Sequence, residues 1–170
     1  LDINSFIEAF AAAAAIEAEG LSVVDIQTKR IRENPKPPFT TSTLQQEASR
    51  KLGFSASRTM QIAQKLYEGV NIGSETTGLI TYMRTDGVQL GSEALASVRG
   101  EIGQRFGNRY LPNSPRIYRT AAANAQEAHE AIRPTDISRA PQEISSYLDY
   151  DLQRLYDLLL QRPIASQTES

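Results

Sequence analysis

The sequence predicts a mainly helical protein of the α+β class, and three observations lead to this expectation. Apolar residues recur at helical spacing in several stretches, with hydroxyl side chains before them or glycine after them. The β signal is confined to two short runs, around residues 21–31 and 78–90. A proline-rich stretch, residues 34–38, separates the first helix and strand from the rest. We therefore expect a helical domain with a small β-hairpin, preceded by a short helix-strand piece of an adjoining domain.

The N-terminal piece carries the clearest local signals. Residues Ser5 to Glu8 have the spacing of a capping box, and the alanine-rich stretch that follows favours helix to about Glu19. Gly20 is expected to end this helix. Leu21 to Ile31 alternates and is rich in β-branched residues, which predicts a strand.

Beyond the proline-rich boundary we expect further helices separated by turns. They run from Thr43 to Leu52, from Ser55 or Ser57 to Tyr67, from Ser92 to Phe106, from Gln126 to Ile132 and from Tyr150 to Gln161. In the second of these, the predicted buried side carries Met60, Ala63, Leu66 and Tyr67. In the last, it carries Leu152, Leu155, Tyr156, Leu158 and Leu159.

The order of two short helices around a glycine-containing turn, followed by a hairpin, is typical of a helix-turn-helix with a wing. The strand around Tyr82 would form the first arm of that wing. Asp86 and Gly87 are a favoured hairpin turn, and residues 88–90 would start the return. We therefore expect a winged-helix-like domain.

Composition excludes several functional classes. The 170 residues include no cysteine and one histidine, which excludes disulfides, thiolate metal sites and a multi-histidine zinc centre. The alanine run near the N-terminus is too short and too interrupted by glutamate to span a bilayer, and no signal peptide is visible. We expect a piece of a larger intracellular protein that does not contact a membrane.

Charge is unevenly distributed along a chain whose net charge is only -2. Residues 29–67 hold eight bases against two acids, and residues 99–119 hold five arginines against one glutamate. Basic stretches of this kind can form a nucleic-acid-binding surface. The alternative is that they are ordinary solvated helix faces.

The stretch from Gly78 to Gly87 contains the strongest chemical signal. In an extended segment Tyr82, Arg84 and Asp86 project from one side, because residues two apart share a face. Free tyrosine has a pKa near ~10, so a fixed positive charge must favour the phenolate before a tyrosine can attack phosphorus. An arginine beside it can also neutralise phosphate charge in the transition state. On spacing alone, a hairpin strand with a packed tyrosine and a solvated arginine explains the same pattern.

Two other stretches could assist such chemistry. His129 and Arg133 lie one turn apart if residues 126–132 are helical, and together they could hold a phosphate. A lone histidine is also commonly structural. Residues 40–43 are all threonine or serine at a predicted helix start, where hydroxyls such as that of Thr43 cap the helix and can also bond phosphate.

Taken together, these stretches resemble the type IA DNA topoisomerases, specifically the bacterial topoisomerase I family. The resemblance is carried by PFTTSTLQQEA at 38–48, ITYMRTD at 80–86 and EAHEAIRPT at 127–135, and it extends from about Pro37 to Gln167. One departure is Gly87, where many family members carry serine. The resemblance implies a partial arch (hinge) domain over residues 1–38, the active-site tyrosine domain over 39–165, and a return towards the arch domain over 166–170.

The resemblance also implies roles for single residues. Tyr82 would be the nucleophile that cleaves single-stranded DNA and forms a 5′-phosphotyrosine link, with Arg84 stabilising charge and His129 assisting at the phosphate. Arg133, Arg58 and Thr43 are the expected DNA-binding residues, while Asp86 would support the site.

The family's Mg²⁺ site lies in a Toprim domain, and its Asp-x-Asp-x-Glu pattern does not occur in this chain. We therefore expect no metal site here, single-stranded DNA and the parent's Toprim and arch domains as partners, and an isolated fragment without relaxation activity. The alternative is a non-catalytic winged-helix DNA-binding module, which would have no need of Tyr82 and Arg84 at these positions.

Overall fold

A computed structural model describes residues 3–20, 22–31, 33–119 and 130–169 of the chain. It divides the chain into two compact units, Leu1–Arg32 and Glu33–Ser170. The first unit contains helix α1 (Phe6–Glu19), whose N-terminus is capped as predicted by the Ser5 hydroxyl, which accepts a hydrogen bond from the Glu8 amide. Gly20 ends it with a φ of 72°.

The predicted strand at 21–31 is wrong for the residues described there. Residues 22–31 form no strand, and their apolar side chains are exposed, with Val24 exposed to 94%. Alternation alone does not make a strand, because a strand also needs a partner for its backbone hydrogen bonds and an apolar layer for one face. The described residues of this unit supply neither to the segment.

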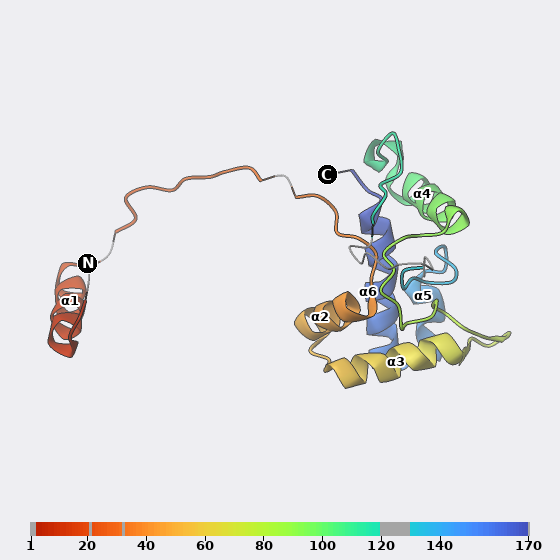
Figure 1. The fold of residues 1–170 in the computed structure, drawn as a ribbon, viewed down its shortest axis with the longest axis horizontal. Helices are drawn as coiled ribbons and strands as arrows, with labels where there is room; N and C mark the ends of the chain where they lie inside the picture. The colour runs from red at the N-terminus through yellow and green to blue at the C-terminus, as the bar shows by residue number, and fades with distance from the viewer. Residues whose placement is uncertain (1–2, 21, 32, 120–129, 170) are drawn as a thin grey trace. The chain divides into compact units, whose positions relative to one another are not determined.

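The second unit is mainly helical and contains one small two-stranded sheet (Figure 1). Its elements are α2 (Thr41–Leu52), α3 (Ala56–Glu68), β1 (Val70–Asn71), β2 (Thr76–Thr77), α4 (Ser92–Phe106), the 3-10 turn η1 (Asn108–Tyr110), α5 (Pro141–Ile144), the 3-10 turn η2 (Ser145–Tyr147) and α6 (Tyr150–Ser166).

Local signals in the sequence set the ends of these helices. Thr40 caps α2 through a reciprocal capping box with Thr43, and Gly53 ends the helix in the left-handed conformation. Ser55 caps α3, so the earlier of the two predicted cap positions is correct. Helix α6 continues beyond its predicted end at Gln161 to Ser166.

Helix α6 runs through the middle of the second unit and contacts α2, α3, α4 and α5 (Figure 1). Its predicted apolar side is buried, namely Leu152, Leu155, Tyr156, Leu158 and Leu159. A large core lies between α2, α3 and α6, and a smaller one lies between α4 and the C-terminal part of α6. Burial of apolar surface in these two cores, which contributes ~25 cal/mol per Å², stabilises the folded second unit.

The hairpin lies elsewhere than predicted. The antiparallel pair is β1 with β2, with Val70 opposite Thr77, and it precedes Tyr82 instead of containing it. Ile80 pairs with Pro134, and Gln89 pairs with Glu130, so residues 88–90 do not return along the segment of Tyr82. The Asp-Gly signal at 86–87 loses to a third extended segment, residues 130–134, which pairs with both Ile80 and Gln89 in place of a pairing between the two expected arms.

That third segment corrects the predicted helix at 126–132. Residues 126–129, including His129, lie outside the described residues, while Glu130 and Ile132 are paired in isolated bridges and Ala131 lies between them. Ala131 and Ile132 are fully buried. The following proline disfavours helical backbone at Arg133, and burial between two neighbours favours an extended chain. The predicted helix is therefore wrong for residues 130–132, the part of it that the structure describes.

Candidate functional site

The segment that carries Tyr82 is hydrogen-bonded along one side to residues 131–135. The Thr81 amide donates to the Arg133 carbonyl oxygen at 2.8 Å, and the Thr135 amide donates to the Leu79 carbonyl oxygen at 3.0 Å. The Thr81 hydroxyl donates to the Ala131 carbonyl oxygen at 2.9 Å. These bonds hold the backbone immediately before Tyr82 in one position.

The residues after Tyr82 are held by the first turn of α2. The Thr41 hydroxyl donates to the Met83 carbonyl oxygen at 2.7 Å and accepts a hydrogen bond from the Thr85 amide at 2.9 Å. The Thr41 amide donates to the Thr85 carbonyl oxygen at 2.9 Å. The backbone on both sides of Arg84 is thus fixed to a helix end that lies far away in the sequence.

The described parts of the three sequence motifs therefore form one local structure. The Ile132 amide donates to the Phe39 carbonyl oxygen at 2.8 Å, which joins the start of the first motif to the third. The second motif lies on the other side of the third, through the bridge between Ile80 and Pro134. The bonds from Thr41 close the arrangement by joining the first motif to the second.

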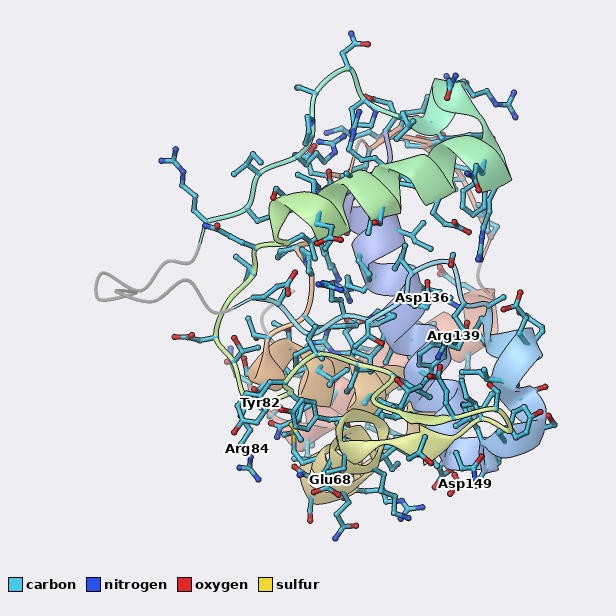
Figure 2. The ribbon with its side chains drawn as sticks, turned by 90° about the vertical axis from the view of Figure 1, so that its right-hand side faces the viewer. Glu68, Tyr82, Arg84, Asp136, Arg139 and Asp149 are labelled. Carbon is cyan, nitrogen blue, oxygen red and sulfur yellow. The ribbon has the colours of Figure 1, made fainter. Side chains whose placement is uncertain are left out.

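Side chains along the Tyr82 segment alternate in exposure. Tyr82 is 50% exposed, Arg84 and Asp86 are also exposed, and Met83 between them is fully buried. Tyr82 and Arg84 extend outward at the edge of the unit in Figure 2. Among the residues that the structure describes, Arg84 has no hydrogen-bond or ion-pair partner. A phenol and an unpaired guanidinium therefore face solvent from one fixed turn, an arrangement that can accept a phosphate group.

Tyr67, for which the sequence predicts no functional role, touches the candidate nucleophile. The Tyr67 and Tyr82 ring centroids lie 5.4 Å apart, with an interplanar angle of 66°. Tyr67 was predicted on the buried side of its helix but is 40% exposed. Its position in the last turn of a helix that leads towards the site is the one sequence signal that could have pointed to it.

Arg133 already has partners in this structure. Its guanidinium forms two hydrogen bonds to the Glu130 carboxylate, at 2.7 and 3.0 Å, and a third to the Pro134 carbonyl oxygen. Glu130 also accepts a hydrogen bond from the Gly91 amide, at the N-terminus of α4. Arg133 thus links the third motif to α4, and a phosphate would have to compete with a bidentate carboxylate for it.

The other two predicted DNA-binding residues also have structural contacts. Arg58 forms an ion pair with Asp151 at 2.6 Å. It lies nine residues before Tyr67 on α3, roughly 14 Å along the axis at ~1.5 Å per residue. The Thr43 hydroxyl accepts a hydrogen bond from the Thr40 amide at 2.9 Å as part of the helix cap. The structure does not bring either residue into a described contact with Tyr82 or Arg84.

No group of three or more acidic, histidine or cysteine side chains that could hold a metal ion occurs among the described residues. The described residues therefore do not fit a Mg²⁺ site. In the same part of the chain, no helix is both long enough and apolar enough to cross a membrane.

Comparison with known proteins relates this geometry to a family. A sequence model of the family described as DNA topoisomerase matches residues 2–170. The chain is 56% identical over 155 residues to DNA topoisomerase 1 of Rickettsia felis, covering 91% of this chain and 20% of that protein. It is 51% identical over 170 residues to DNA topoisomerase 1 of Zymomonas mobilis, covering 100% of this chain and 13% of that protein.

A solved structure shows the same similarity. Full-length topoisomerase I from Thermotoga maritima matches with a TM-score of 0.68 at 44% sequence identity, covering 80% of this chain and 21% of that one. The chain thus spans only a minor part of these relatives, between 13% and 21% of their lengths.

Proposed function

Because the chain belongs to the bacterial DNA topoisomerase I family, we propose that it supplies the nucleophilic half of a type IA enzyme that cleaves and reseals single-stranded DNA. The observation that supports this most is that one turn presents both Tyr82 and Arg84. Both side chains project into solvent from a turn that is hydrogen-bonded on both sides, and Arg84 has no partner among the described residues. Such a turn holds a nucleophile and a charge-stabilising group in place before substrate arrives.

In the proposed reaction, the Tyr82 phenolic oxygen attacks a DNA phosphorus atom. The new bond joins tyrosine to the 5′-phosphate, the bond from phosphorus to the 3′ oxygen breaks, the phenol loses its proton and the departing 3′ oxygen gains one. Arg84 neutralises charge on the non-bridging oxygens as it develops. One phosphodiester replaces another, so resealing by the reverse reaction requires no ATP, and strand passage between the two steps relaxes negative supercoils.

The remaining machinery is expected in other parts of the parent protein. We propose that a Toprim domain holds Mg²⁺ and that an arch domain carries the tyrosine domain away from it after cleavage. The described residues of this chain offer no set of ligands for that ion. On this basis the isolated chain should not relax DNA and should bind it only weakly, with strong dependence on salt.

DNA contacts of Arg58, Thr43 and Arg133 remain predictions, as does the assistance of His129. Each of the first three has a protein partner that DNA would have to displace or share. Arg84 has none among the residues described, so we propose it as the principal phosphate contact in this chain.

The decisive experiment measures covalent capture of DNA. Full-length parent enzyme is incubated with an end-labelled single-stranded oligonucleotide and denatured, and the protein-linked label is quantified. Wild-type enzyme should give an adduct, Tyr82→Phe should give none, and the exposed control Tyr150→Phe should match wild type. A wild-type enzyme that binds the oligonucleotide without forming an adduct would favour the alternative, a non-catalytic DNA-binding module. An undiminished adduct with Tyr82→Phe would exclude Tyr82 as nucleophile.

A further inference from the structure

We propose that Tyr67 is a positioning residue that holds the Tyr82 ring in the orientation needed for attack on DNA. The inference rests on the proposed function of Tyr82 and adds a second aromatic residue to that site. It is carried by the contact between the two rings, by the way the Tyr67 backbone is fixed, and by the lack of other contacts that would hold the Tyr82 hydroxyl.

The two rings meet edge to face. Their centroids are 5.4 Å apart and their planes are inclined by 66°. This is one of the favoured geometries for aromatic pairs, because the positive edge of one ring meets the negative face of the other. The contact is therefore attractive in this orientation and limits the rotation of both side chains.

The backbone of Tyr67 is fixed relative to the segment that leads to Tyr82. The Leu79 amide donates to the Leu66 carbonyl oxygen at 2.7 Å, next to Tyr67 in α3. Gly78 packs so closely that a Cβ atom there would lie 2.6 Å from the Tyr67 carbonyl oxygen. On α3 itself, Ala63 and Leu66 are fully buried in the core. Tyr67 therefore presents its ring from a rigid support.

Tyr82 has little else to orient it. Its side chain is 50% exposed, and its hydroxyl makes no hydrogen bond to any residue that the structure describes. An exposed side chain samples several rotamers, and each wrong rotamer reduces the fraction of enzyme poised for attack. The Tyr67 ring reduces that sampling. Its removal should therefore lower the rate of cleavage and leave the affinity for DNA unchanged.

The proposal requires the ring of Tyr67 and not its hydroxyl. Phenylalanine should therefore replace Tyr67 with little loss, whereas leucine or glutamine should not. Glutamine is a good helix former and suits an exposed position, so it provides a second non-aromatic variant if leucine perturbs folding.

The test uses full-length parent enzyme with a labelled single-stranded oligonucleotide at saturating concentration. Single-turnover rates of adduct formation, Kd for the oligonucleotide and melting temperature are measured for wild type, Tyr67→Phe, Tyr67→Leu and Tyr67→Gln. We expect Tyr67→Phe within about twofold of wild type and the other two about tenfold slower, with Kd and melting temperature unchanged. Tyr150→Leu, which removes another exposed tyrosine, serves as the control and should leave the rate unchanged.

Three results would overturn the proposal. Cleavage at the wild-type rate by both Tyr67→Leu and Tyr67→Gln would show that the ring contact has no role. A slow Tyr67→Phe variant would assign the effect to the hydroxyl. A weaker Kd with an unchanged saturating rate would make Tyr67 a DNA-stacking surface instead. The proposed function fails separately, when wild-type enzyme yields no adduct or Tyr82→Phe yields a normal one.

Discussion

The Thr41 hydroxyl lies 2.7 Å from the carbonyl oxygen of Met83, the residue between Tyr82 and Arg84. The same hydroxyl accepts a hydrogen bond from the Thr85 amide. One side chain at the start of α2 therefore satisfies two backbone groups of the turn that presents the candidate nucleophile. Because those groups are partly shielded from water, their positions depend on this hydroxyl.

Replacing Thr41 with valine keeps the shape of the side chain but removes both bonds. We expect Thr41→Val to lower the free energy of unfolding of the second unit by about 1–3 kcal/mol, because two backbone groups lose their partner. In the parent enzyme it should also slow adduct formation. Urea denaturation and single-turnover cleavage measure the two effects. Thr41→Ser keeps the hydroxyl and should retain most of both properties, and the exposed Ser42→Ala should change little. Wild-type behaviour of Thr41→Val would show that the turn is held by its other contacts.

Gly78 sets the distance between α3 and the Tyr82 segment. A Cβ atom at this position would lie 2.6 Å from the Tyr67 carbonyl oxygen, a clash that flexible side-chain movement cannot relieve because the neighbour is backbone. Gly78→Ala should therefore destabilise the unit by about 1–3 kcal/mol in urea denaturation, as overpacking does elsewhere.

Gly100 provides a matched control for this substitution. It lies within α4, and a Cβ atom there would have no neighbour within 4 Å. Gly100→Ala should stabilise the protein by about 0.5–1 kcal/mol through higher helix propensity. Equal effects at the two glycines would mean that the close approach at Gly78 has no energetic consequence.

Sequence reasoning predicted α1, α2, α3, α4 and α6 because their signals are local, whereas the helix expected at 126–132 is wrong over its described residues 130–132. The Thr40 cap and Gly53 end of α2, the Ser55 cap of α3 and the buried side of α6 each follow from residues within a few positions. The alternation around Tyr82 also follows from local spacing, with Met83 buried between exposed neighbours. These features need no knowledge of the rest of the chain.

The pairing of extended segments was not predictable in the same way. Residues 130–135 lie between the segments of Phe39 and Ile80, and nothing near either segment in the sequence indicates this partner. The Asp-Gly pair at 86–87 favours a hairpin locally, but burial of Ala131 and Ile132 outweighs it. The role of Tyr67 was missed for the same reason, because its ring contact spans a loop and a hairpin.

Glu47 is a nearly buried carboxylate surrounded by cations on α2 and α6. Arg162 lies 3.2 Å from it, while Lys51 and Arg50 lie at 3.5 and 3.6 Å. Arg162 is itself largely buried and lies over the Phe39 ring, 4.2 Å from its centroid. Burial lowers the pKa of the Arg162 guanidinium, and the Glu47 carboxylate acts in the opposite direction.

Removing the Glu47 carboxylate should lower the stability of the second unit. We expect Glu47→Ala to lower the free energy of unfolding by about 3–5 kcal/mol, because it leaves the Arg162 charge buried without its partner. Arg50→Ala, which removes an exposed member of the same cluster, should change it by less than about 1 kcal/mol. Urea denaturation of both variants compares them directly, and similar small effects would show that Arg162 reaches solvent when Glu47 is absent.

Tyr156 should make stability depend on pH in the alkaline range. Its side chain is fully buried, its hydroxyl donates to the Arg139 carbonyl oxygen at 3.1 Å, and burial raises its pKa to about 12. In the unfolded chain the phenol titrates near ~10, so the folded state holds the proton more tightly. The stabilisation is complete below pH ~10 and is lost as pH rises through the folded pKa, by about 1.4 kcal/mol per pH unit between the two values.

Tyr156→Phe should start less stable at pH 8, by about 1 kcal/mol for the lost hydrogen bond. Its stability should then fall less steeply above pH ~10. The residual slope should include Tyr118, whose pKa burial also raises. Urea denaturation at intervals from pH 8 upward tests this, with the exposed Tyr150→Phe as control. Parallel curves for wild type and Tyr156→Phe would mean that the pKa of the Tyr156 phenol is the same in the folded and unfolded states. Burial of the side chain would then not raise its pKa.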